Sequence, residues 1–185
     1  MSTRERPIAV FALQEIGDCL LHKTMGEKAR KMLEKTLKQT SAGTVVIIDC
    51  AGVDLFDASF AGSFLAKTVA TLPVDFPDRA LIVKGLDDDM RENLDPALTK
   101  LGLMMIELVG KQYQLRGHFS PTDQQTLALL HKQRKPFTVR ELAESLSINV
   151  TAAHERLTKL AKMAVLWRQT AETGRAQQLF IAPAT

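Results

Sequence analysis

The stretch that most constrains the fold is residues 44–66, TVVIIDCAGVDLFDASFAGSFLA. Its opening run, Val45 to Ile48, is β-branched and apolar without alternation, which predicts a strand that is covered on both faces. Asp49 ends this run, and Gly52 permits the tight reversal that follows it. Apolar side chains then recur at helical spacing, at Phe60, Phe64 and Leu65. The stretch therefore predicts a buried strand, a turn and a packed helix.

Strands and helices are expected to alternate on both sides of this stretch. The pattern predicts strands at 8–13, 80–84 and 103–108, and helices at 24–38 and 87–100. Cys19 to Leu21 is expected to form a short strand beside the first one, across a turn at Gly17-Asp18. Residues 112–115 fit either an edge strand or a linker. Alternation of this kind indicates an α/β fold, a mixed sheet with packed helices.

Length and composition bound the class of protein. A chain of 185 residues can hold one large domain or two small ones. No apolar run approaches the ~18 residues of a membrane span, and no cleavage site follows the basic start, so we expect no membrane contact and a cytoplasmic location. Cys19 and Cys50 both lie in apolar patterns, which predicts two reduced core thiols.

Charge is distributed unevenly along the chain. Up to His118 there are 15 Lys and Arg against 16 Asp and Glu, a net charge of −1. From Phe119 onward there are 9 basic residues against 5 acidic ones, a net charge of +4. The carboxyl-terminal part therefore carries the basic excess of the whole chain, which favours an anionic partner for that part only.

After Ser120-Pro121 the pattern changes to helices. We expect helices at 122–133, 139–146 and 151–163, followed by a hairpin of strands at 165–169 and 177–181 around Thr173-Gly174. Thr138 is expected to cap the second of these helices, with Glu141 at capping-box spacing. The change of pattern predicts two domains, residues 1–117 and residues 118–185.

The order helix, helix, turn, helix, hairpin resembles winged helix-turn-helix DNA-binding domains. The resemblance rests on FTVRELAESLSINVTAAHERLTKLAKMAVLWRQ, where Ile148 would fill the turn and Leu157 and Leu160 would anchor the third helix. Ala164 stands where such domains often have glycine. The resemblance implies double-stranded DNA as a partner, with a set of candidate DNA contacts on the third helix and the hairpin: Asn149, Thr151, Ala152, Arg156, Lys159, Lys162, Arg168 and Arg175.

The side chains of the third helix support this reading chemically. A helix in the major groove presents side chains to base edges, and its flanks reach phosphates. Arg156 is suited to a guanine edge or to a phosphate, whereas Lys159 and Lys162 are suited to phosphates. Glu155 argues mildly against DNA, because a carboxylate near phosphates is repulsive unless it accepts from a cytosine amino group. Ordinary solvated charges are the alternative reading of this face.

The amino-terminal part resembles STAS domains, and more closely a STAS-like family of unknown function that is often joined to DNA-binding modules. The resemblance covers roughly residues 10–108 and rests on VVIIDCAGVDLFDASFAGSFL. In anti-sigma-factor antagonists of this fold, a serine at the start of the helix is phosphorylated to break a protein complex. Ala58 removes that acceptor here, and Phe60 replaces a glycine. Asp57 and Ser59 remain as candidates for phosphorylation or partner contact, although either one can equally serve as a helix cap.

These patterns lead to two hypotheses from different classes. The first is a transcriptional regulator without catalytic residues or cofactors, whose STAS-like domain contacts a protein or senses a signal while the winged helix binds DNA. The second is an assembly module in which the winged helix binds only protein. A homodimer is compatible with either one. Asp87-Asp88-Asp89 is expected to favour a helix start rather than a metal, and the four histidines lack ligand spacing.

Overall fold

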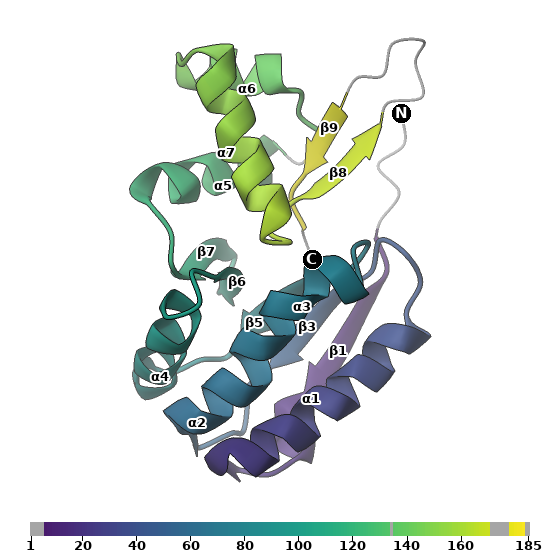
Figure 1. The fold of residues 1–185 in the computed structure, drawn as a ribbon, viewed down its shortest axis with the longest axis vertical. Coiled ribbons are helices and arrows are strands. Elements are labelled where there is room, and N and C mark those ends of the chain that lie inside the picture. Colours follow the sequence, from purple (N-terminus) through teal and green to yellow (C-terminus); the bar gives the residue numbers. More distant parts are fainter. Residues whose placement is uncertain (1–5, 134, 171–177, 184–185) are drawn as a thin grey trace.

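A five-stranded mixed sheet forms the centre of the fold (Figure 1). The computed structural model describes residues 6–133, 135–170 and 178–183. The sheet has the order β1-β3-β5-β6-β7, from strands Ile8–Ala12, Val45–Asp49, Ala80–Lys84, Met104–Val109 and Gln112–Gly117. The first four of these strands are parallel, and β7 runs antiparallel to β6. The expected α/β fold with a mixed sheet is therefore confirmed, and residues 112–115 belong to an edge strand.

The helices that connect the parallel strands lie together on one face of the sheet. Each new parallel strand is added beside the previous one, so right-handed crossovers bring the connecting helices to the same face. These helices are α1 (His22–Gln39), α2 (Ala58–Ala61), α3 (Lys67–Asp75) and α4 (Asp88–Thr99). Their apolar stripes and one side of each of β1, β3, β5 and β6 form a first core, in which Leu33, Phe64 and Leu94 are fully buried.

The middle helix of this layer contains a change of winding. A π segment, η2 (Gly62–Ala66), joins α2 to α3, so the chain continues helically from Ala58 to Asp75. As predicted, Phe60, Phe64 and Leu65 are fully buried. The rings of Phe60 and Phe64 lie 5.4 Å apart between centroids. The π segment places consecutive residues 63–66 in the core, which a regular helical face could not do.

Two expectations in this region are wrong. The short strand β2 (Cys19–Leu20) does not pair with β1 but runs parallel to β4 (Leu55–Phe56), because the 3₁₀ turn η1 (Leu13–Glu15) separates it from the first strand. The carbonyl of Asp18 accepts hydrogen bonds from the amides of Asp54 and Leu55 at this junction. Cys19 is consequently exposed at the surface, whereas Cys50 is buried as expected.

The carboxyl-terminal elements follow the predicted order closely. They are α5 (Pro121–Gln133), α6 (Val139–Leu146), α7 (Val150–Lys162) and an antiparallel pair, β8 (Trp167–Thr170) and β9 (Gln178–Ile181). We refer to α5 through β9 as the C-terminal unit. The predicted hairpin tip at Thr173-Gly174 lies outside the described residues. Ala164 has a positive φ of 56°, which explains why a glycine suits this position.

The second face of the sheet shares a core with the C-terminal unit. Side chains of alternate positions in β3, β5 and β6 point away from α1–α4, and they are at most 6% exposed: Val45, Ile47, Ala80, Ile82, Met104 and Ile106. They belong to one apolar cluster with residues of all three helices of the C-terminal unit, including Leu127, Leu142 and Leu157. Both faces of β3 are therefore covered, as its sequence predicts, and the unit that covers the second face is the C-terminal one.

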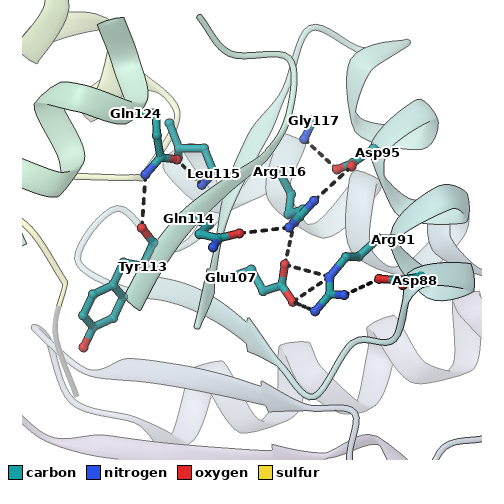
Figure 2. Close-up of polar contacts among 10 residues, drawn as sticks. All are labelled: Asp88, Arg91, Asp95, Glu107, Tyr113, Gln114, Leu115, Arg116, Gly117 and Gln124. Carbon is teal, nitrogen blue, oxygen red and sulfur yellow. Dashed lines mark hydrogen bonds and ion pairs between the residues drawn. The ribbon is translucent and has the colours of Figure 1, made fainter. Parts of the chain in front are cut away.

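A buried carboxylate joins α4 to the last two strands of the sheet (Figure 2). Glu107 in β6 is only 1% exposed, and its carboxylate forms ion pairs with two arginines. Arg91 of α4 donates from Nη2 to Oε1 of Glu107 at 2.8 Å, and Arg116 of β7 donates from Nε to Oε2 at 2.5 Å. Asp95 of α4 accepts from the amide of Gly117 at 3.0 Å. These groups satisfy one another, so the network reads as structural.

The β7 edge of the sheet is closed by a side chain from α5. Oε1 of Gln124 accepts the amide hydrogen of Leu115 at 2.7 Å, and its Nε2 donates to the carbonyl of Tyr113 at 3.1 Å (Figure 2). The Tyr113 ring also stacks on His131 of α5, with centroids 3.8 Å apart. Gln124 thus imitates a neighbouring strand and fixes the C-terminal unit to the sheet edge.

Candidate nucleic-acid interface

Helix α7 is positioned by its cap and by its apolar stripe. Oδ1 of Asn149 accepts the amide hydrogen of Ala152 at 2.7 Å, which fixes the first turn of the helix. Three positions face the core and are fully buried: Ala153, Leu157 and Leu160. The opposite face is accessible. In Figure 1 the first turn of α7 lies beside α6, away from the sheet, and the last turn lies next to the sheet.

The structure places most of the predicted contacts on one side of this helix. Asn149, Thr151 and Lys162 are exposed, whereas Ala152, Arg156 and Lys159 are half-buried. Neither Arg156 nor Lys162 makes an ion pair with any residue in the described part of the chain. The guanidinium of Arg156 and the ammonium of Lys162 are therefore available to an anionic ligand.

Lys159 is engaged inside the protein. Its Nζ lies 2.5 Å from Oδ2 of Asp123, a residue of α5 that is 2% exposed. Burial raises the pKa of the Asp123 carboxyl, but hydrogen bonds from Lys159 and from Ser120 outweigh this effect and hold the pKa below its usual value. The Lys159 side chain remains 41% exposed. Its ammonium thus links α7 to α5 through an ion pair and still faces solvent on one side.

The conformation of the segment before α7 is held by hydrogen bonds among its own residues. Thr138 and Glu141 form the predicted capping box, with the Thr138 amide donating to Glu141 at 2.8 Å and the Glu141 amide donating to Oγ1 of Thr138 at 3.1 Å. Ser147 ends α6 in a left-handed conformation, with φ at 52°. The amide of Ile148 returns to the carbonyl of Ala143 at 3.0 Å. The angle between α6 and α7 is therefore fixed by a short, hydrogen-bonded turn.

An open concavity runs along the outer side of α7. It is lined by His154, Glu155, Thr158, Lys159, Lys162 and Met163. His154 and Thr158 approach each other at 3.5 Å, and the Glu155 carboxylate is exposed beside them. The concavity is consequently mixed in charge, with basic groups at Lys159 and Lys162 and a carboxylate at Glu155.

The strands after α7 carry one more predicted contact. Arg168 of β8 is exposed, and its guanidinium lies 5.6 Å from the ring centroid of Phe180 on β9. Such a position over an aromatic ring orients the guanidinium without neutralising its charge. Arg175 lies outside the described residues.

The second candidate site lies at the start of α2. Asp57 is the cap of this helix: its Oδ1 accepts the amide hydrogen of Phe60 at 2.7 Å. Its Oδ2 accepts the amide hydrogen of His22 at 3.1 Å, at the start of α1. Ser59 is exposed in the first turn of α2, but it is not the cap. Asp57 therefore joins two helix starts, and Ser59 lies exposed two residues after it.

Sequence reasoning missed the internal partner of Lys159 and the place of His154 and Met163 in the lining of the concavity. Asp123 lies 36 positions before Lys159, and its place in the first turn of α5 gives an ordinary reason for an acidic residue. Asp87 likewise caps α4 by accepting from the Met90 amide at 2.8 Å. Among the described residues, no group of three or more His, Cys, Asp or Glu side chains is placed to hold a metal ion.

No model of a known family matches the chain, and no curated protein matches it significantly. In the described part of the chain, no helix combines the length and the apolar character needed to cross a bilayer.

Proposed function

We propose that this chain is a DNA-binding transcriptional regulator, with a winged helix-turn-helix unit at its carboxyl-terminal end and a STAS-like domain before it. The observation that carries the proposal is the accessible face of α7, where Arg156 and Lys162 have no ion-pair partner among the described residues. Basic groups on an exposed, firmly capped helix are what major-groove recognition requires. The net positive charge of the sequence from Phe119 onward also favours DNA binding by the carboxyl-terminal part.

Each candidate side chain then has a distinct role. Arg156 lies in the middle of the helix and reaches a base edge or the nearest phosphate. Asn149 and Thr151 are at the first turn, where polar side chains and helix amides meet phosphates. Lys162 and Arg168 flank the helix and contribute phosphate contacts. Lys159 acts differently: it secures α7 on α5 through Asp123 and offers only its exposed side to DNA.

The test is fluorescence anisotropy with DNA selected in vitro by the full chain. Arg156→Ala should weaken binding to the selected sequence by about 1–3 kcal/mol if Arg156 reads a base. Lys162→Ala should weaken binding to all sequences alike and lower the slope of log affinity against log salt by about 1.

Lys31→Ala supplies the matched control. Lys31 is an exposed lysine of α1 with no ion pair among the described residues, so its removal changes the net charge equally at a distance from α7. Binding of the control should equal that of the parent chain. A selection that enriches no sequence over bulk competitor, or an Arg156→Ala affinity equal to the control, would refute the assignment.

A protein-assembly role is the second candidate, because Val150 at the start of α7 is 56% exposed. An apolar side chain there suits a protein partner better than a phosphate backbone. Val150→Ser separates the two functions: it should leave DNA affinity nearly unchanged in a DNA reader, and it should weaken association in an assembly module.

For the STAS-like domain we propose protein contact through the surface around Ser59, with Asp57 as its structural support. A phosphate on Ser59 would gain from the helix amides but would add charge beside the Asp57 carboxylate. Mass spectrometry of the chain, isolated from stressed cells of its natural host, tests modification directly. An unmodified Ser59 under every stress would leave partner contact as its only proposed role.

A further inference from the structure

The two edges of the central sheet are treated differently. At the β7 edge, Gln124 occupies the outward amide of Leu115 and the outward carbonyl of Tyr113. At the other edge, β1 pairs only with β3 in the described part of the chain. Its segment Ile8–Ala12 carries no charged residue, and charge is the usual protection of an open edge. The β1 edge is therefore available for pairing with another strand.

The register of β1 determines which backbone groups are open. The amide of Val45 donates to the carbonyl of Pro7 at 2.9 Å, and Ile8 is the partner of Val45 in the ladder. In a parallel pair, alternate residues direct both their N–H and their C=O toward the same neighbour. Pro7, Ala9 and Phe11 thus face β3, and the N–H and C=O groups of Ile8, Val10 and Ala12 face outward.

The open edge also presents apolar side chains. Ile8 is 50% exposed and Val10 is 56% exposed, although both lie on the sheet face that the C-terminal unit covers over β3, β5 and β6. On the opposite face of the same strand, Phe11 is buried against α1–α4. The apolar surface of the second core therefore continues onto β1, where nothing described covers it.

We propose that a second copy of this chain pairs with β1, antiparallel and about a two-fold axis at Val10. The outward groups at Ile8, Val10 and Ala12 are symmetric about Val10, so Val10 meets the partner's Val10 and Ile8 meets the partner's Ala12 with their hydrogen bonds matched. With this register no charged side chains oppose each other between Ile8 and Ala12. The result is one continuous sheet through two protomers, with the apolar side chains of both β1 strands adjacent.

Self-pairing is favoured over a foreign strand because the edge is complementary to itself. In a two-fold pair, the outward hydrogen-bonding groups of one β1 match those of the other. The exposed Ile8 and Val10 of each strand lie next to apolar side chains of the other, and no charged side chain of the segment is buried. The contact is short, so we expect a dissociation constant of roughly 1–100 µM, typical of small interfaces.

Sedimentation equilibrium of the full chain, from about 1 to 500 µM to bracket a weak interface, measures the association. Val10→Lys places two like charges against each other at the axis and should weaken dimerisation at least tenfold. Val74→Lys is the control, because Val74 is an exposed valine of α3 at 82% and the charge change is the same. A monomer at every concentration would overturn the proposal, as would equal dimerisation of Val10→Lys and the parent chain.

A disulfide test locates the axis independently of affinity. Hydrogen-bonded antiparallel partners have Cα atoms about 5.5 Å apart, which is within the range that a disulfide spans. Val10→Cys in a Cys19→Ser background should therefore form a covalent dimer under mild oxidation. Val74→Cys in the same background should not. Equal cross-linking of both variants would mean random collision and would exclude the axis at Val10.

Discussion

At the scale of single residues, Gly26 of α1 occupies a position that has no room for a side chain. A Cβ built at this position would lie 2.0 Å from Oγ of Ser63 and 3.0 Å from the carbonyl oxygen of Phe60. Glycine is normally unfavourable within a helix by about 1 kcal/mol relative to alanine. Its presence in α1 is explained by the close approach of α1 to the α2–η2 segment.

Replacement of this glycine should therefore reverse the usual effect of helix propensity. Gly26→Ala should lower the free energy of unfolding by about 1–3 kcal/mol, the usual cost of overpacking a core. Gly62→Ala is the control, since a Cβ there meets nothing within 4 Å and the backbone is right-handed helical. The control should gain up to about 1 kcal/mol. Urea unfolding measures both, and a stabilised Gly26→Ala would contradict the contact.

At the scale of elements, the attachment of α7 to α5 depends on an ionised Asp123. Its pKa in the folded state is held below the usual value. The carboxylate therefore contributes stability at pH values above its unfolded pKa of about 3.9, and this contribution is lost as the pH falls through the folded value. The pKa values of Asp49 and Glu141 are lowered as well, so acid weakens the sheet and the α6 cap in the same range.

Asp123→Asn isolates the contribution of the α5–α7 attachment to acid stability. The variant should be less stable than the parent chain above about pH 5, and the difference should shrink as the pH falls below about 4, because the parent then loses the same charge. Urea midpoints between pH 3 and pH 7 measure this difference. A gap that stays constant across the whole range would show that the charge of Asp123 is not what stabilises α7.

Local signals in the sequence were sufficient for most elements but not for their partners. The apolar run of β3, the capping box at Thr138 and the stripe of α7 are each decided by residues a few positions apart. The pairing of β2 with β4 and the contact between Asp123 and Lys159 depend on residues about 36 positions apart, whose side chains are ordinary in their local context. The π segment η2 was equally hidden, because Phe60 of α2 and Phe64 of η2 keep ordinary helical spacing.

The candidate site shows the same division between local and distant information. The exposed face of α7 followed from its stripe, so Asn149, Thr151, Arg156 and Lys162 could be named in advance. The prediction that Lys159 contacts phosphate stays a prediction, with the added fact that its ammonium already has an internal partner. Only the folded chain reveals that partner.

At the scale of the whole molecule, the sheet separates two hydrophobic cores and contributes side chains to both. Its first face packs on α1–α4 and its second on the C-terminal unit. Arg6, just before β1, also lies over the ring of Trp167 in β8, with the guanidinium carbon 4.0 Å from the ring centroid. Burial lowers the pKa of Arg6. The predicted boundary near residue 117 therefore separates two sequence patterns whose apolar surfaces are in contact.

Thermal unfolding of the full chain should accordingly give a single cooperative transition. A chain cut after Gly117 would expose the apolar side chains at Val45, Ile82 and Ile106, and it should aggregate or lose its near-ultraviolet circular dichroism. Calorimetry and circular dichroism measure the two outcomes. Two separate transitions, or a soluble and folded amino-terminal fragment, would show that the second core contributes little.

The closure of the β7 edge by Gln124 has a consequence for how such a chain can evolve. A carboxyl-terminal unit joined by a free linker can be exchanged for another without regard to its neighbour. Here the first helix of the unit supplies the last partner of the sheet, so a replacement unit would need a glutamine at the same turn and a matching apolar face. Recombination at this junction would therefore yield few recombinant proteins that fold. The sheet domain and the C-terminal unit should accordingly be inherited together.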